Sequence, residues 1–167
     1  GTFALDSLLC QTLAPPANID IAEAQEQLES DVSGLSLRES VIELTKSDDC
    51  MSCHRVINPL GFGFENYSGI GMPLDEPTVL ESVSLGGTQT ASPITLSFTG
   101  VEQLQEELLR SRQLYDCATI QAVRYANTLP HPNELELREI QSDFFDSRDV
   151  RSLFRGLALA MYADYEG

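Results

Sequence analysis

Apolar residues recur every three or four positions along most of this sequence, which predicts a mainly α-helical protein. The spacing is helical from Phe3 to Cys10, where Pro15 and Pro16 follow, and again from Gly100 onward. The later part has four apolar stripes, each of which predicts a helix with one face in a core: Val101, Leu104, Leu108 and Leu109; Cys117, Ile120, Val123 and Ala126; Leu137, Ile140 and Phe144; and Val150, Leu153, Phe154, Leu157 and Met161.

The middle of the chain has weaker patterns. Residues 20–32 contain good helix formers but few apolar positions, which fits either a surface helix or a solvated loop. Ser36, with Glu39 three residues later, has the pattern of a capping box and predicts a helix running into Cys50. β-Branched residues on both sides of Gly86-Gly87 predict a short β-hairpin near residues 79–98.

Five consecutive residues carry the strongest chemical signal, Cys50-Met51-Ser52-Cys53-His54. A C-x-x-C-H run is the attachment signature of a c-type haem, in which two thiols add to the porphyrin vinyl groups and the imidazole ligates the iron. A zinc site needs a second pair of ligands at similar spacing, whereas Cys10, Cys117 and His131 occur singly. A thioredoxin-type dithiol is typical of a βαβ setting, which the flanking sequence does not resemble.

Gly and aromatic residues follow the motif, in the run from Asn58 to Tyr67. A flat porphyrin needs close backbone approach and apolar packing, which glycine and phenylalanine provide. An ordinary Gly-rich loop is the alternative. If haem takes two cysteines, Cys10 and Cys117 remain, and we expect them to form a disulfide, the alternative being two buried thiols. Such a disulfide closes a loop of about a hundred residues, worth roughly 4–5 kcal/mol, and indicates an oxidising compartment.

Length and charge narrow the classes of function. The chain of 167 residues has the size of one domain, residues 1–167, and no apolar run approaches the ~20 residues that span a bilayer. It has no initiator Met and no signal-peptide pattern, so we expect a mature or excised segment. Ten basic against 26 acidic residues give a net charge of −16, which excludes nucleic acid as a partner and favours a redox partner with a basic docking surface.

The central segment resembles a family of secreted bacterial mono-haem c-type cytochrome domains. The family's hallmarks are a CxxCH, then Asp/Asn-Pro-Leu-Gly-Phe, then Glu-Asn-aromatic, which match Cys50–His54, Asn58–Phe62 and Glu65–Tyr67. The flanks around Leu9-Cys10 and Cys117 also match. The chain departs from the family at Asn127-Thr128-Leu129, where Leu-Gly-Arg is usual after Tyr-Ala, and at Gly71-Met72-Pro73, where Gly-Arg-Trp is frequent.

The resemblance implies a cytochrome c-like helical domain around one covalent haem c. It implies export to the periplasm or the medium, because haem attachment takes place outside the cytoplasm. The proximal iron ligand is then His54, and the carbonyl of Pro59 is expected to accept its imidazole N–H. The residues expected to bind the haem are Cys50, Cys53, His54, Pro59, Leu60, Phe62, Phe64 and Tyr67.

The second axial ligand is open on the sequence alone. Met72, in a Gly-Met-Pro context, is favoured over Met161, His131 and Lys46, because methionine is a frequent second ligand in electron carriers. Met51 lies within the attachment motif, on the same side as His54. The family usually lacks methionine at the position of Met72.

Three functions follow from these residues. The first is one-electron transfer by an isolated, monomeric domain that is not an enzyme. Related modules occur beside carbohydrate-binding modules, so the resemblance extends this function to supplying electrons for oxidative polysaccharide degradation. The second is a peroxidase-like haem enzyme or small-ligand sensor with an open sixth coordination position. The third, a structural or carbohydrate-binding module, lacks support because Trp is absent and the five Tyr are scattered.

Overall fold

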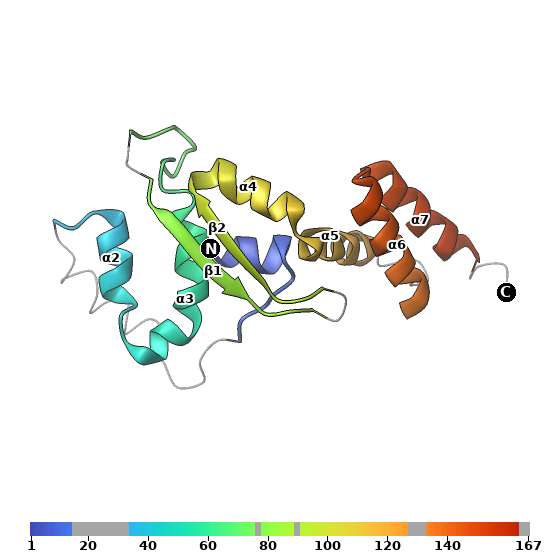
Figure 1. Ribbon diagram of the computed structural model, residues 1–167, viewed down its shortest axis with the longest axis horizontal. Helices are drawn as coiled ribbons and strands as arrows, with labels where there is room; N and C mark the ends of the chain where they lie inside the picture. The colour runs from blue at the N-terminus through green and yellow to red at the C-terminus, as the bar shows by residue number, and fades with distance from the viewer. Residues whose placement is uncertain (15–33, 76–77, 89–90, 127–132, 164–167) are drawn as a thin grey trace.

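The structure is a computed structural model that describes residues 1–14, 34–75, 78–88, 91–126 and 133–163. Within these ranges it is mainly helical with one small antiparallel hairpin, which confirms the predicted fold class (Figure 1). The elements are, in order, η1 (Ala4–Leu8, a π-helical turn), α2 (Leu37–Leu44), α3 (Asp48–Phe62), β1 (Leu80–Leu85), β2 (Ile94–Thr99), α4 (Gly100–Arg110), α5 (Arg112–Tyr125), α6 (Glu134–Ser147) and α7 (Val150–Ala163). The segment 20–32 and His131 lie outside the described residues.

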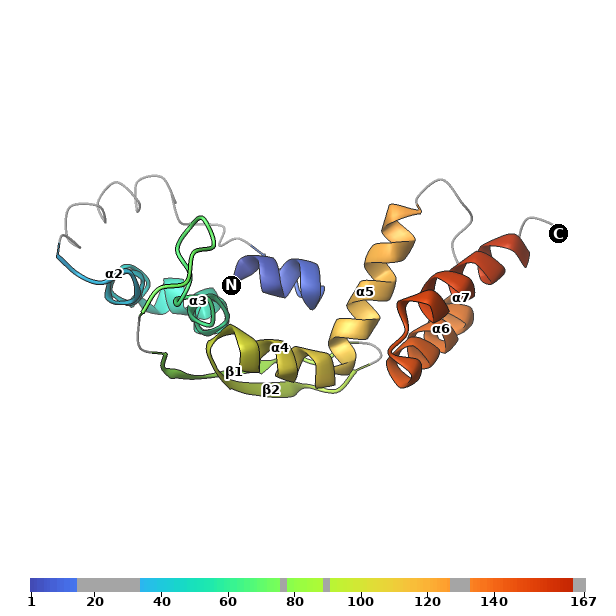
Figure 2. The same cartoon turned by 90° about the horizontal axis from the view of Figure 1, so that it is seen from above.

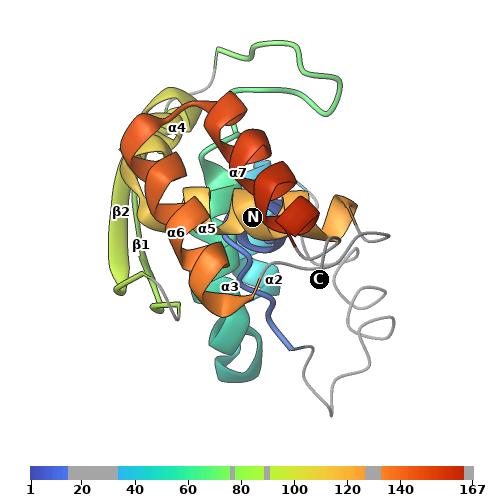
Figure 3. The same cartoon turned by 90° about the vertical axis from the view of Figure 1, so that its right-hand side faces the viewer.

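The predicted hairpin is confirmed and forms one outer layer of the molecule. β1 and β2 pair antiparallel with Leu80 opposite Thr99 and Leu85 opposite Ile94. Alternate residues of β1 are buried, so one face of the hairpin packs on helices and the other carries serine and threonine toward solvent. Figure 2 and Figure 3 show the helices gathered on that one face. The buried face of the hairpin therefore packs against α3 and α4.

The chain turns from β2 into α4 at Gly100, whose φ of 71° is a conformation that favours glycine. A first core lies between η1, α3, the hairpin and α4, with Leu60 of α3 and Phe98 of β2 fully buried. At the end of α3, a Cβ on Gly63 would stand 3.0 Å from the Phe98 ring and 3.1 Å from Leu104. The close approach of backbone and ring fixes the end of α3 against this core.

A second core joins the last three helices, each of which an apolar stripe predicted, although on α5 its buried residue is Tyr115, outside the predicted stripe, and Phe154 of the last stripe is exposed. It is built from Tyr115, Ile140, Phe144, Leu153 and Leu157, and the Tyr115 ring meets that of Phe144 edge to face at 5.1 Å. Figure 1 shows α6 and α7 side by side at the end of the molecule away from α2. Leu114 of α5 packs against both cores, so α5 links the two halves.

The predicted disulfide between Cys10 and Cys117 is confirmed. It connects the segment after η1 to the middle of α5, with the two Cα atoms 5.3 Å apart. Cys117 is almost fully buried. Because η1 belongs to the first core and α5 to both, the bridge ties the two halves together. No described helix is both long and apolar enough to cross a bilayer.

Candidate haem site

The CxxCH motif occupies the first two turns of α3. Ser47 caps this helix by accepting a hydrogen bond from the backbone N–H of Cys50 at 3.3 Å. Asp48 and Asp49 lie in the first turn, where negative charge suits the helix dipole. Cys50 lies one turn before His54 on the same helical face, and Cys53 lies about a quarter turn around the helix from His54. Both cysteines are free thiols and half-buried.

The helix that presents the motif differs from the predicted one. The capping box of Ser36 and Glu39 is confirmed, and its hydrogen bonds lower the pKa of the Glu39 carboxyl. The helix it starts, α2, ends at Leu44 instead of reaching Cys50, and Ser47 begins a new helix. This break was not predicted, because Thr45 and Ser47 also fit a helix interior at modest cost.

Helix α3 continues into the Gly- and Phe-rich segment after the motif, for which an ordinary loop was the alternative to haem packing. Pro59 lies inside the helix, and its carbonyl accepts the backbone N–H of Gly63 at 3.2 Å. Proline lacks a backbone N–H, so the carbonyl one turn earlier, on Arg55, receives no helical hydrogen bond from it. The Asn58–Phe62 segment is therefore a helical extension of the motif, and residues one turn apart from His54 to Phe62 can share one face.

A groove lies between α2 and α3 on the face that carries His54. Its volume is about 460 Å³, within the range of about 300–1,000 Å³ of ligand pockets. Most of its surface is apolar. The residues that line it are Ile42, Thr45, Lys46, Met51, His54, Arg55, Asn58, Pro59 and Phe62. A second cavity, of about 200 Å³, adjoins the disulfide and is too small for a porphyrin.

The imidazole of His54 is held by a hydrogen-bonded series that the sequence analysis missed. Nδ1 of His54 lies 2.8 Å from Oδ1 of Asn58, and Nδ2 of Asn58 donates to Oγ1 of Thr45 at 2.9 Å. The hydroxyl of Thr45 donates to the carbonyl of Val41 at 2.7 Å. The structure thus places Asn58, rather than the expected carbonyl of Pro59, against Nδ1. The signal was present in the sequence, because residues four apart on a helix are neighbours.

Arg38 fastens α2 to the rest of the molecule and so fixes the outer wall of the groove. Its guanidinium donates to the carboxylate of Glu65 at 2.8 Å and to that of Glu81 at 2.5 Å. It also lies over the ring of Phe62, 4.1 Å from the centroid. Burial lowers the pKa of Arg38, but the hydrogen bonds and charges of Glu81 and Glu65 outweigh it and raise the pKa overall.

Replacing this arginine is expected to loosen the groove. Arg38→Met removes charge-assisted hydrogen bonds from two largely buried carboxylates, so we expect the free energy of unfolding to fall by about 1.5–3 kcal/mol. Urea unfolding measures the effect. Arg110→Met is the matched control, because the pairs of Arg110 with Glu106 and Glu107 are exposed and worth about 1 kcal/mol or less. Equal losses in the two variants would contradict a special role for Arg38.

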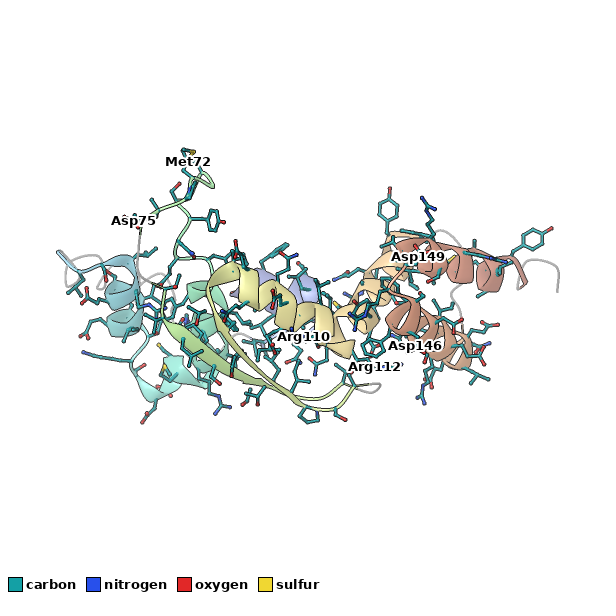
Figure 4. The ribbon with its side chains drawn as sticks, turned by 45° about the horizontal axis from the view of Figure 1, so that its top comes forward. Met72, Asp75, Arg110, Arg112, Asp146 and Asp149 are labelled. Carbon is teal, nitrogen blue, oxygen red and sulfur yellow. A yellow bond between two sulfur atoms is a disulfide. The ribbon has the colours of Figure 1, made fainter. Side chains whose placement is uncertain are left out.

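The structure does not bring Met72 to the groove. Met72 lies in the loop after α3, where Tyr67 and Pro73 form an antiparallel bridge and the backbone N–H of Met72 donates to Oγ of Ser68 at 3.1 Å. Figure 4 shows Met72 at the outer tip of this loop, directed away from the helices. Its side chain is 59% exposed. The methionine that lines the groove is Met51.

The other residues expected at the site lie in several different places, and neither Cys50 nor Cys53 is among the residues that line the groove. Pro59 and Phe62 line the groove with His54. Leu60 instead lies on the opposite side of α3, fully buried in the first core, because its position is about a third of a turn from His54 in the direction away from the groove. Phe64 and Tyr67 follow the end of α3 and are exposed. Met161 is buried on α7, which belongs to the other half of the molecule.

The donor set at the groove suits a porphyrin better than a bare metal ion. Within the described ranges no three His, Cys, Asp or Glu side chains converge as metal ligands. A porphyrin brings four nitrogen ligands of its own, so one imidazole from the protein is an adequate contribution. Two free thiols on the same helix, one and four residues before this imidazole, complete the set that a covalently attached haem uses.

The comparisons with known proteins found a family match that covers the region of the candidate haem site. Residues 1–76 match the family model PSCyt3, described as a protein of unknown function (DUF1588). No curated protein and no solved structure matches the chain. The matched segment is somewhat less than half of the chain, and it contains the CxxCH motif and every residue that lines the groove. The part of the chain that carries the candidate haem site is thus similar to the PSCyt3 family.

Proposed function

We propose that this protein is a mono-haem c-type cytochrome that transfers single electrons outside the cytoplasm. One observation carries the proposal: α3 presents two free thiols and an imidazole, and that imidazole lines an apolar groove of about 460 Å³. The name of the PSCyt3 family, which hints at a cytochrome-like domain, supports it. The proposal does not require an enzymatic reaction.

Residues of the motif and residues of the groove share the task of binding the group; of the motif, Met51 and His54 line the groove, whereas Cys50 and Cys53 do not. Cys50 and Cys53 supply the thiols for covalent attachment, and His54 supplies the axial nitrogen. Haem contributes an iron atom that alternates between the ferric and ferrous states. Ile42 and Phe62 give the apolar walls that exclude water from one side of a flat ring. Lys46 and Arg55, two of the ten basic residues of the chain, lie at the same groove, where cationic groups suit carboxylates such as the haem propionates.

Charge and redox chemistry define the partner and the compartment. With a net charge of −16, the protein suits a partner with a basic docking surface and a small, transient interface. The Cys10–Cys117 disulfide supports a location outside the cytoplasm, where such bridges persist. We propose the periplasm or the medium. The link to oxidative polysaccharide degradation rests on the resemblance to modules that accompany carbohydrate-binding modules.

A second candidate function is a haem enzyme or sensor with an open sixth coordination position. The positions of two methionines favour it: Met72 is exposed at a loop tip, and Met161 is buried in the other half of the molecule. In the electron-transfer proposal, Met72 remains the proposed second ligand, and its loop has to approach the iron. Visible and near-infrared spectra separate the two functions. A low-spin ferric haem whose methionine band disappears in Met72→Ala supports the carrier, whereas a high-spin ferric haem supports the enzyme or sensor.

The proposed function is tested by haem attachment. The protein is produced in a bacterial periplasm together with the haem attachment machinery, and covalent haem is measured by intact mass and by the spectrum of the pyridine complex. We expect one haem per chain, lost completely in Cys50→Ala/Cys53→Ala. The control is Ser52→Ala, which alters the motif between the thiols without removing a ligand and is expected to keep full loading. A protein that carries no covalent haem under these conditions contradicts the proposal.

A further inference from the structure

We propose that Asn58 and Thr45 hold His54 as the Nδ1–H tautomer, with Nε2 left free to ligate iron, and that Asn58 is thereby a positioning residue that sets the redox properties of the site. The part about the tautomer concerns the polypeptide alone. The part about redox properties rests on the proposed function.

The carbonyl of Val41 can only accept hydrogen bonds. It lies 2.7 Å from Oγ1 of Thr45, which therefore donates its single hydroxyl proton there. Oγ1 must then accept in its other contact, the one at 2.9 Å with the side-chain amide of Asn58. The amide nitrogen of Asn58 consequently faces Thr45, and its oxygen faces the imidazole.

The oxygen of an amide has no proton to give, so the contact of 2.8 Å between Oδ1 of Asn58 and Nδ1 of His54 requires a proton on Nδ1. A neutral imidazole carries one proton, which leaves the lone pair on Nε2. In water, a neutral histidine side chain favours the opposite tautomer, with the proton on Nε2. The network therefore prepares His54 for ligation before any iron is present.

The reverse orientation of the Asn58 amide makes one hydrogen bond fewer. It would place Oδ1 against Thr45, and Thr45 could satisfy that oxygen only by withdrawing its proton from the carbonyl of Val41. Thr45 is 8% exposed, so water has little access to replace the lost bond. The orientation seen satisfies the three contacts together.

The network also connects the imidazole to the packing of α2. Thr45 is the residue at the C-terminal end of α2, and its backbone N–H also donates to the carbonyl of Val41, at 3.1 Å. Arg38 fastens α2 to Glu65 and Glu81. The orientation of His54 thus depends on a helix that contributes none of the three residues of the motif.

The character of the acceptor determines how strongly the imidazole donates to iron. A carboxylate in place of Asn58 raises the basicity of the imidazole, whereas an apolar side chain removes the acceptor altogether. A more basic axial ligand stabilises ferric iron and lowers the reduction potential. Asn58, a neutral acceptor, holds the site between these limits.

The first test is nitrogen-15 NMR of histidine-labelled, haem-free full-length protein at a pH at which the imidazoles are neutral. The sequence has two histidines, so a His131→Gln variant assigns the signals of His54. We expect a dominant Nδ1–H tautomer, shifting to dominant Nε2–H in Asn58→Leu and partly shifting in Thr45→Val. Thr45→Ser keeps the hydroxyl and should restore the original tautomer. Thr95→Val is the control, because its hydroxyl contacts Ser84 on the exposed face of the hairpin.

The second test is the reduction potential of the haem-loaded protein, which decides the matter also where a haem-free variant fails to fold. We expect a lower potential in Asn58→Asp, a higher one in Asn58→Leu and no change in Thr45→Ser. An unchanged tautomer in Asn58→Leu, or equal potentials in Asn58→Asp and Asn58→Leu, overturns the inference. Failure of covalent haem attachment in the protein with its natural sequence instead overturns the proposed function. The tautomer of His54 is still decided by the NMR measurement on the haem-free protein.

Discussion

Removing the Cys10–Cys117 bridge is expected to lower the free energy of unfolding by about 4–5 kcal/mol. The two cysteines are 107 residues apart, so the bridge removes a large loop-closure entropy from the unfolded chain. It also holds η1 and the first core to α5 and the second core. In the described part of the chain, α5 contacts η1 and α4 on one side and α6 and α7 on the other, so the bridge adds a covalent restraint to the helix that joins the two halves. Since domains of this size are stable by only about 5–15 kcal/mol, the loss is a large share of the total.

Urea unfolding of Cys10→Ala/Cys117→Ala measures this effect. The matched control is Cys50→Ala/Cys53→Ala in the haem-free protein, which also removes two sulfur atoms but no bridge, and we expect it to change stability little. Intact mass after thiol alkylation must show two free thiols, those of Cys50 and Cys53, in the haem-free protein with its natural sequence. Four free thiols in freshly purified protein, or a loss below about 1 kcal/mol, would show that the bridge does not restrain the unfolded chain.

Phe98→Ala is expected to be the most damaging change within the cores, with a loss of about 3–5 kcal/mol. The ring is fully buried, between the end of α3 at Gly63 and the helix that carries Leu104. The backbone of Gly63 already approaches the ring closely. Neither α3 nor α4 can therefore move into the space left by the ring without displacing the hairpin as well. We expect the cavity to remain and the melting transition to broaden toward lower temperature.

Phe154→Ala is the control for this substitution. Phe154 is 56% exposed on α7, so its truncation should cost much less than that of Phe98. Phe98 packs in the first core with Leu60, on the side of α3 away from the groove. The Phe98→Ala variant should therefore still attach haem at a temperature at which it is folded. Loss of haem attachment in folded Phe98→Ala would show that the hairpin shapes the groove directly.

Local signals predicted most of the secondary structure. The capping box at Ser36, the apolar stripes after Gly100 and the β-branched runs around Gly86-Gly87 each depend on residues close in sequence, and all three are confirmed. The disulfide was predicted by assigning the other two cysteines to the motif. These features need no knowledge of distant contacts.

The residues that shape the groove depend on such contacts and were not predicted. Arg38 pairs with Glu65 and Glu81, which are 27 and 43 residues away, and nothing in the local pattern distinguishes Arg38 from the other arginines. The helix through Pro59 was missed because proline normally ends or bends a helix, and here packing of Leu60 in the core compensates for the lost hydrogen bond. Whether Met72 binds the iron stays a prediction, since Met72 is exposed and is not among the residues that line the groove.

The pairing of Cys10 with Cys117 has a consequence for how the protein is made. Of the four cysteines in the sequence, the bridge joins the first and the fourth and passes over Cys50 and Cys53. During synthesis and export Cys10 meets both of these thiols before Cys117 has emerged, and four cysteines allow three complete pairings. A correct product therefore requires Cys50 and Cys53 to stay reduced, or to react with haem, until Cys117 has been exported. Otherwise, early wrong disulfides must be corrected by thiol–disulfide exchange. The order of oxidation and haem attachment thus becomes a determinant of yield.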